Sequence, residues 1–368
     1  MARVELHKLR LSFGRIVAVD GLCLEIPDGA LLCLLGPSGS GKTSTLRMIA
    51  GLETPDGGTI TLGGRDITHL EPRDRRIGMM FQGYALYPHL TVGANIAYPL
   101  RVRGVARAER EARVREVAGL LEIEPLLGRS TRQISGGQAQ RVALARAIVQ
   151  KPDLYLLDEP ISNLDASLRS TMRGVLKRLQ RQLGTTSIVV SHDQLDALAM
   201  ADLVAVLSNG TLQQLGTPDE IYGRPANTFV ARFVGDPQMN LVAGELHREN
   251  GNLGVRVCGQ LINLTPEAAS ALTRTSAKAV TVGIRPRAIQ IGRQPGPGRI
   301  PATVFVAAPE GSRVVYDLRV GDETFKAETD ADARLGLAPD DEVYLELRPQ
   351  NLHFFAAPSE RGGGDRIA

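Results

Sequence analysis

The sequence predicts two domains: an α/β domain with a helical insertion, followed by a smaller β-rich domain. Residues 1–235 alternate between strand and helix patterns, which is typical of α/β domains. After Asp236-Pro237 the pattern changes to short β-rich stretches separated by Gly, Pro and Asp. A length of 368 residues suits two domains. We therefore expect the domains to be residues 1–235 and 236–368.

The first domain is predicted to contain short, apolar strands. Leu31–Leu35 is a strand that leads into a Gly-rich turn and then into a helix at Ser44–Ala50. Three further apolar runs predict strands at Leu154–Leu157, Ser187–Val190 and Val204–Leu207. Residues from about 84 to 150 are expected to form a helical subdomain, because the charged stretch 106–127 carries apolar residues at helical spacing.

The second domain is predicted to be a small closed or half-closed β-barrel. Five β-rich stretches support it, namely Gly254–Leu264, Ala279–Ile291, Ala302–Ala308, Val314–Val320 and Glu342–Phe355. The last stretch, Pro358–Ala368, contains three consecutive glycines, and we expect it to be a frayed tail.

Composition excludes several classes of protein. The longest unbroken apolar run is Ala30–Leu35, whereas a membrane span needs about 20 residues. The net charge of 43 − 40 = +3 is too small for a dedicated nucleic-acid binder, and the scattered arginines fit a coding bias. The N-terminus lacks the apolar core of a signal peptide, and Cys23, Cys33 and Cys258 show no metal-ligand spacing. We expect buried free thiols and a cytosolic chain.

A phosphate-binding pattern follows the first apolar strand. The residues Gly36-Pro37-Ser38-Gly39-Ser40-Gly41-Lys42-Thr43 fit G-x4-G-K-[ST], in which glycines let backbone N–H groups turn toward phosphates. The helix that begins here directs its positive end at the same anion. Lys42 is predicted to bind the β- and γ-phosphates, and Thr43 to ligate Mg²⁺. The candidate nucleotide-binding residues of this loop are Gly36, Ser38, Gly39, Gly41, Lys42, Thr43 and Ser44.

Two carboxylates follow the apolar strand Leu154–Leu157. Asp158, at the end of the strand, can hold Mg²⁺, and Glu159 can polarise the attacking water. The alternative is a pair of solvated loop acids, but the phosphate-binding pattern in the same chain favours catalysis. Together the two motifs predict hydrolysis of a nucleoside triphosphate without indicating how its energy is used.

A third motif, Ile134-Ser135-Gly136-Gly137-Gln138, closes the helical subdomain one helix upstream of Asp158. In addition, Gln82 follows an apolar run, Ser162-Asn163-Leu164-Asp165 comes just after Glu159, and His192 closes the strand Ser187–Val190. In this order the set resembles the ATP-binding cassette (ABC) ATPases over essentially all of residues 1–235. The fold implied by the resemblance is a P-loop ABC ATPase domain with a helical insertion.

The resemblance implies catalytic roles for three residues. Gln82 resembles the glutamine that senses Mg²⁺ and the γ-phosphate, and His192 resembles the switch histidine that contacts the γ-phosphate. With Glu159, these are the implied catalytic residues. Thr43, Gln82 and Asp158 are the implied Mg²⁺ ligands.

Further roles are implied around the nucleotide. Phe13 falls where the family keeps an aromatic ring that stacks on adenine. Ser135, Gly137 and Gln138 resemble the signature segment that binds the γ-phosphate across a dimer interface, and Asp165 resembles the residue that bridges the two halves. Because one chain carries one P-loop and one signature segment, a homodimer, or a dimer with a similar ATPase, is expected to hold two ATP molecules.

Other segments narrow the resemblance to importers. Residues 82–92 look like the region of importer ATPases that docks on a membrane subunit, and residues 221–227, 233–240 and 283–286 resemble maltose/glycerol-3-phosphate-type subunits. Asp236 and Arg287 depart from the usual pattern. The resemblance implies a regulatory C-terminal domain of OB-like or TOBE type. It also implies ATP and Mg²⁺ as cofactors and a peripheral position on the cytoplasmic face of a bacterial inner membrane. The implied partners are integral-membrane permease subunits, indirectly an extracytoplasmic solute-binding protein, and a cytosolic regulator at the C-terminal domain.

The main interpretation is an ATPase that powers an importer of carbohydrates or glycerol-3-phosphate-like solutes. An importer of polyamine, sulfate or ferric iron is the nearest alternative. A soluble ABC ATPase of DNA maintenance would need long insertions between its motifs, and residues 42–158 leave no room for them. A binding module built on the β-barrel would need aromatic residues interleaved with basic ones on the C-terminal strands, and these strands lack that pattern, so no nucleic-acid partner is expected.

Overall fold

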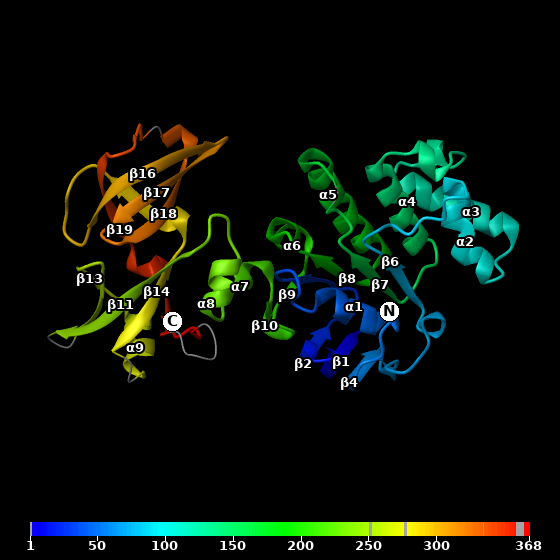
Figure 1. The fold of residues 1–368 in the computed structure, drawn as a ribbon, viewed down its shortest axis with the longest axis horizontal. Helices are drawn as coiled ribbons and strands as arrows, with labels where there is room; N and C mark the ends of the chain where they lie inside the picture. The colour runs from blue at the N-terminus through cyan, green and yellow to red at the C-terminus, as the bar shows by residue number, and fades with distance from the viewer. Residues whose placement is uncertain (1, 163, 250–251, 276–277, 334, 358–363) are drawn as a thin grey trace. The chain divides into compact units, whose positions relative to one another are not determined.

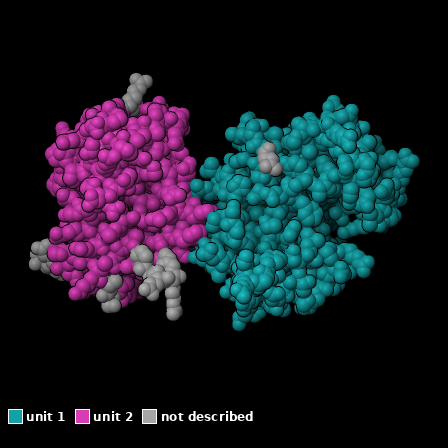
Figure 2. Space-filling view, viewed as in Figure 1, with its two compact units in different colours: residues 1–220 teal, residues 221–368 magenta. Residues whose placement is uncertain are grey.

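The computed structural model describes residues 2–162, 164–249, 252–275, 278–333, 335–357 and 364–368. The chain divides into two compact units, residues 1–220 and 221–368, which are coloured separately in Figure 2. Among the described residues, none of the helices combines the length and the apolar character that a membrane-spanning helix needs.

The first unit contains two sheets (Figure 1). A four-stranded antiparallel sheet has the order β2-β1-β4-β5, with bounds β1 Val4–Phe13, β2 Ile16–Ile26, β4 Gly57–Leu62 and β5 Arg65–Asp66. A six-stranded sheet has the order β10-β9-β3-β8-β7-β6, with bounds β3 Leu31–Leu35, β6 Ile77–Met80, β7 Leu154–Asp158, β8 Thr186–Ser191, β9 Leu203–Ser208 and β10 Thr211–Gly216. All its pairs are parallel except β9 with β10. The predicted α/β domain is therefore confirmed.

The core of the first unit lies between the two sheets and α1 (Lys42–Ala50). Every residue of β3 and β7 is buried, which explains their apolar composition, because a parallel sheet is covered on both faces. The helices α5 (Ala166–Leu183) and α6 (Gln194–Met200) complete the unit. The antiparallel sheet, by contrast, leaves Cys23 exposed, because it lies between inward-facing residues of an alternating strand.

The predicted helical subdomain consists of α2 (Val92–Val102), α3 (Arg107–Leu120) and α4 (Gly136–Ile148), which contact one another and are grouped together in Figure 1. Val114 and Val117 of α3 are buried, as their spacing predicts. Leu120 is exposed, because it lies at the end of the helix, while Leu121 is buried just after it.

The second unit consists mainly of two five-stranded antiparallel sheets around one core. The first has the order β13-β12-β11-β14-β20, with bounds β11 Asn240–Glu249, β12 Asn252–Val257, β13 Gln260–Asn263, β14 Ala279–Ile284 and β20 Leu352–Ala356. The second has the order β15-β19-β16-β17-β18, with bounds β15 Ile289–Gly292, β16 Ile300–Glu310, β17 Arg313–Val320, β18 Glu323–Asp330 and β19 Glu342–Leu347. The helices are α7 (Pro218–Gly223), which spans the division, α8 (Thr228–Phe233) and α9 (Pro266–Thr273). The predicted β-rich C-terminal domain is confirmed.

Two details of this unit differ from expectation. Cys258 is exposed, because it lies in the turn between β12 and β13 with a φ of 46°, so of the three free cysteines only Cys33 is buried. Residues 358–363 lie outside the described part. Residues 364–368 are held rather than frayed, since Asp365 bridges to Asn227 and the Phe354 amide donates to the Ala368 carbonyl at 2.8 Å.

The division after Glu220 lies upstream of the boundary predicted at residue 235. Arg285, which is 6% exposed, explains this. Its guanidinium donates to the carbonyl oxygens of Tyr222 at 2.6 Å, Ala231 at 3.2 Å and Val234, and it stacks over the Tyr222 ring at 4.1 Å. Burial lowers the pKa of Arg285 to about 10. The segment that follows Glu220 thus packs with the β strands.

Candidate active site

The P-loop joins the end of β3 to the start of α1, as the sequence predicts. Gly36 requires a glycine, because a Cβ there would lie 2.3 Å from the Leu207 carbonyl oxygen. Gly41 caps α1 with a φ of 98°, and a Cβ there would lie 2.5 Å from the Ala18 carbonyl oxygen. Only glycine therefore fits these two positions without displacing the backbone. Ser38, Gly39 and Thr43 are exposed and Ser44 is half-buried.

Lys42 lies folded against its own loop. Its Nζ donates to the carbonyl oxygens of Gly36 and Pro37, at 2.8 Å each, and to Ser40 Oγ at 3.4 Å. The side chain is buried, and burial lowers the pKa of its ammonium, while the charges of Glu159 and Asp158 raise it. The cation is therefore held at the inner wall of the loop, opposite two carboxylates, where a phosphate can replace the carbonyl oxygens as its acceptor.

The two carboxylates occupy different environments at the end of β7. Asp158 is 5% exposed, and its Oδ1 has no hydrogen-bond partner among the described residues. Burial and the neighbouring charge of Glu159 raise the pKa of Asp158, and Arg47, Thr43 and Lys42 lower it. A buried carboxylate oxygen without a partner is costly. With the Thr43 hydroxyl, it forms an oxygen donor set that suits a hard divalent cation.

Glu159 is the centre of a group of three polar side chains. Gln82 Nε2 donates to Glu159 Oε2 at 2.9 Å, and His192 Nδ1 lies 3.1 Å from Glu159 Oε1. The Glu159 backbone has a φ of 49°, an uncommon value for a residue with a side chain, and its amide donates to the Val190 carbonyl at 3.1 Å. The structure therefore brings together the three residues with implied catalytic roles.

The strand order explains this grouping. β7 lies between β6 and β8, and all three run parallel. Gln82 follows β6, Glu159 follows β7 and His192 follows β8. Because the carboxyl ends of parallel strands meet at one edge, the three side chains converge there, and the P-loop follows the next strand, β3.

Phe13 ends β1 at the hairpin to β2 and is 49% exposed. It pairs with Ile16, and two residues further along β2 the Ala18 carbonyl lies against Gly41 of the P-loop. An exposed aromatic ring on a hairpin attached to the P-loop can stack on a base. This geometry is compatible with the predicted role.

The signature segment begins α4. Ser135 and Gln138 form a capping box, in which the Gln138 amide donates to Ser135 Oγ at 3.3 Å and the Ser135 amide to Gln138 Oε1 at 3.0 Å. A Cβ on Gly137 would lie 2.8 Å from Leu168 Cδ2 of α5. Asp165 caps α5 by accepting the Leu168 amide at 2.9 Å. Asn163 lies outside the described residues.

Sequence reasoning missed two arginines near these loops. Arg146 of α4 donates to the carbonyl oxygens of Tyr84 at 2.8 Å and Ala85 at 2.7 Å, and so holds the segment after Gln82. Arg169 of α5 contacts residues on both sides of the site, as described below. The only signal in the sequence that could have found these two arginines is their position near the motifs. The sequence contains so many arginines that this position does not single them out.

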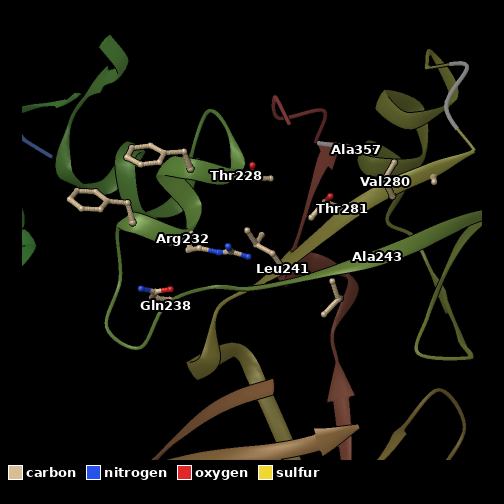
Figure 3. A pocket seen from close by; sticks show the side chains of 12 residues that line it. Thr228, Arg232, Gln238, Leu241, Ala243, Val280, Thr281 and Ala357 are labelled. Carbon is tan, nitrogen blue, oxygen red and sulfur yellow. The ribbon is translucent and has the colours of Figure 1, made fainter. Parts of the chain in front are cut away.

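The second unit contains a cavity of about 760 Å³ between α8 and the strands β11 and β14 (Figure 3). It is lined mostly by apolar side chains, together with Arg232, Thr228 and Gln238. None of the predicted nucleotide-binding residues lines it. The two residues that depart from the importer pattern form ion pairs within this unit: Asp236 with Arg313 at 3.1 Å, and Arg287 with Asp330 at 3.3 Å.

Comparison with known proteins identifies the family. Residues 19–162 match the ABC transporter family, residues 235–289 the MalK OB fold domain, and residues 282–355 the TOBE domain. The trehalose/maltose import ATP-binding protein MalK of Thermococcus litoralis is 45% identical over 96% of this chain and 98% of its own length. The chain belongs to the ABC transporter ATP-binding proteins. As a member of this family it binds ATP and is an ATPase.

Other relatives are of the same kind. The sn-glycerol-3-phosphate import ATP-binding protein UgpC 2 of Agrobacterium fabrum is 43% identical over 96% of this chain and 93% of its own. The sulfoquinovosyl glycerol transport ATP-binding protein SmoE of the same organism is 43% identical over 98% of this chain and 99% of its own. The ABC ATPase MJ0796, solved as a dimer with ADP and Pi, matches 58% of this chain and 98% of its own with 31% identity and a TM-score of 0.53.

Proposed function

We propose that this chain is the ATP-hydrolysing subunit of an importer for carbohydrates or glycerol-3-phosphate-like solutes. The observation that carries the proposal is Glu159, held between Gln82 and His192 beside the P-loop. The names of the relatives favour sugar or glycerol phosphate import over import of polyamine, sulfate or ferric iron. We also propose that the chain lies on the cytoplasmic face of the membrane, bound to permease subunits.

In this mechanism the P-loop amides and the start of α1 bind the phosphates, and the Lys42 ammonium leaves the loop carbonyls to bind phosphate oxygens. Glu159 polarises the attacking water, while Gln82 and His192 hold its two oxygens in place. Thr43 and Asp158, with Gln82, would hold Mg²⁺, which neutralises phosphate charge. The buried, unpartnered Asp158 oxygen supports this assignment.

The change Glu159→Gln tests hydrolysis. An amide has one acceptor oxygen in place of two, so it cannot accept from Gln82 and polarise water as a carboxylate does. We expect ATP hydrolysis by the purified chain to fall about 10²–10⁴-fold, with ATP binding retained. Glu116→Gln on the exposed face of α3 is the matched control. Hydrolysis at the wild-type rate by Glu159→Gln would refute the proposal.

We further propose that ATP is shared between the P-loop of one chain and the Ser135–Gln138 segment of a second copy. A helix N-terminus with a serine hydroxyl offers donors to the side of the triphosphate that the P-loop leaves open. A mixture of Lys42→Ala and Ser135→Arg chains should retain at most one intact site per heterodimer and hydrolyse ATP slowly. Normal hydrolysis by Ser135→Arg alone would contradict a shared site.

The solute class is tested in a cell that lacks this chain. Uptake of a labelled disaccharide and of labelled glycerol 3-phosphate is measured after wild-type chain or Glu159→Gln is restored. We expect only the wild type to restore uptake of at least one of them. Restored uptake of sulfate, polyamine or ferric iron instead would contradict the proposed solutes.

A further inference from the structure

Arg169, in the first turn of α5, links two loops of the active site. Its Nη2 donates to the carbonyl oxygens of Ser162 at 2.9 Å and Leu164 at 3.4 Å. Its Nη1 donates to Asp193 Oδ2 at 3.0 Å. The side chains of Arg169 and Asp193 are only 25% and 22% exposed, so the pair is partly shielded from water. One guanidinium thus binds the segment after Glu159 and the residue after His192.

Asp193 is fixed by both of its carboxylate oxygens. Oδ1 accepts the Leu195 amide at 2.8 Å and caps α6, while Oδ2 accepts Arg169. Its own amide donates to Ser191 Oγ at 3.0 Å. Because Asp193 directly follows His192, these contacts restrict the backbone from which the histidine side chain extends.

The contacts close into a ring around Glu159. Ser162 Oγ donates to the Glu159 carbonyl at 3.2 Å, and Arg169 holds the Ser162 carbonyl. Arg169 also holds Asp193, and His192 Nδ1 lies 3.1 Å from Glu159 Oε1. A displacement of the Ser162 segment is therefore transmitted through one side chain to the backbone beside His192.

We propose that Arg169 is a positioning residue that keeps His192 directed at Glu159 by tying the Ser162 and Leu164 carbonyls to Asp193. The proposal rests on the proposed roles of Glu159 and His192. This positioning role needs an arginine, because a planar guanidinium can bind carbonyls on one side and a carboxylate on the other. A lysine ammonium is a single point of charge and cannot reach both.

Arg173, one turn further along α5, provides the matched control. Its Nε donates to Asp196 Oδ1 at 2.6 Å, and so it also joins α5 to α6. In the described part of the chain its hydrogen bond goes to this carboxylate and not to the Ser162 or Leu164 carbonyl. Its side chain is 22% exposed, close to the value for Arg169. Its Nη2 also lies 4.0 Å from Asp193 Oδ2, so both arginines pair with that carboxylate and they differ mainly in whether they contact the segment after Glu159.

The test compares Arg169→Lys and Arg173→Lys in the full-length chain. We expect Arg169→Lys to lower kcat for ATP about tenfold, with the KM for MgATP within about twofold of wild type, because the P-loop is untouched. Arg173→Lys should lower the melting temperature by about as much as Arg169→Lys does, while its kcat stays within about twofold of the wild-type value. An unchanged kcat in a folded Arg169→Lys chain would overturn the proposal.

A double-mutant cycle with His192→Ala separates positioning from general stability. If Arg169 acts through His192, Arg169→Lys should lower kcat no further in the His192→Ala chain. If Arg169→Lys lowers kcat by the same factor in the His192→Ala chain as in the wild-type chain, the proposal is overturned. Asp193→Asn offers a second variant if Arg169→Lys does not fold, since asparagine can still cap α6 but no longer carries the charge, and it should lower kcat similarly. Glu159→Gln separates failure of the proposed function from failure of the positioning role of Arg169. Only in the first case would Glu159→Gln hydrolyse ATP at the wild-type rate.

Discussion

Replacing Gly41 by alanine should weaken MgATP binding without unfolding the chain. Gly41 precedes Lys42 and has a φ of 98°, where residues with a side chain are strained. The added Cβ would also lie 2.5 Å from the Ala18 carbonyl oxygen and 3.3 Å from Val19 Cγ2. Without nucleotide, the P-loop of the variant can relax by moving away from β2. Binding of MgATP requires the loop to return to its original conformation, so the cost is incurred on binding.

The expected loss of MgATP affinity follows from two costs, the strained φ and the contact with the Ala18 carbonyl oxygen. A strained φ costs about 1–2 kcal/mol, which corresponds to an affinity about 5- to 30-fold lower if the cost is incurred only on binding. The contact with a backbone oxygen adds to this, because a carbonyl in a paired strand has little room to shift. Gly39→Ala is the matched control, since Gly39 has a φ of 79° but nothing within 4 Å of its Cβ.

The assay is the dissociation constant for MgATP by calorimetry, with the melting temperature as a check on folding. We expect the constant to rise from wild type to Gly39→Ala and further to Gly41→Ala. Wild-type affinity in Gly41→Ala would refute the argument that the P-loop must keep this conformation. A larger loss for Gly39→Ala than for Gly41→Ala would refute the part assigned to the Ala18 contact.

Gly137→Ala places a Cβ 2.8 Å from Leu168 Cδ2, the end of a half-buried side chain that can shift, so its melting temperature should stay within about 2 °C of that of Gly136→Ala, which meets open space. Burial and two nearby arginines lower the pKa of His353 to about 4, so the unfolded chain binds this proton more readily. The unfolding free energy of the second unit should therefore fall by about 3 kcal/mol as the pH falls from 6.5 to 4, and calorimetry should find no such fall in His353→Gln. A chain of residues 1–220 should still bind MgATP; loss of binding by a folded truncation would contradict the assignment of the site to the first unit.

Glu159 and His192 could be placed from the sequence because each directly follows a short apolar strand. A polar residue directly after such a strand lies at the edge of a sheet, which placed Glu159 and His192 there, whereas Lys42, the first residue of α1, was identified by the G-x4-G-K-[ST] pattern. The role expected of His192 came from the resemblance to the ABC ATPases. The same reasoning from strands could not place the antiparallel sheet, because its strands alternate and contain no motif. It also could not show that the segment after Glu220 packs with the β strands of the second unit, because the hydrogen bond from Arg285 to the Tyr222 carbonyl spans 63 positions.

Residues that act through long-range hydrogen bonds were not predictable either. Arg146 reaches the Tyr84 carbonyl across 62 positions, and Arg169 reaches Asp193 across 24. The sequence contains many arginines, and nothing distinguishes these two from the rest. Every residue has a backbone carbonyl, so the sequence does not show which carbonyls accept hydrogen bonds from arginine side chains. Such contacts are found only when the elements that carry them are placed in space.

The order of strands in the sheet accounts for the chemistry at Glu159. Along the chain the strands follow as β3, β6, β7 and β8, but in the sheet the order is β3-β8-β7-β6. Glu159 therefore has neighbours from both sides, Gln82 after β6 and His192 after β8, although these lie 77 positions before and 33 positions after it. The P-loop, after β3, adjoins the β8 side of this row. A residue between two strand ends can be oriented by the residues that follow both neighbouring strands. This position supports the proposal that Glu159 holds the attacking water, and the burial of Asp158 beside it supports the proposal that Asp158 holds the cation.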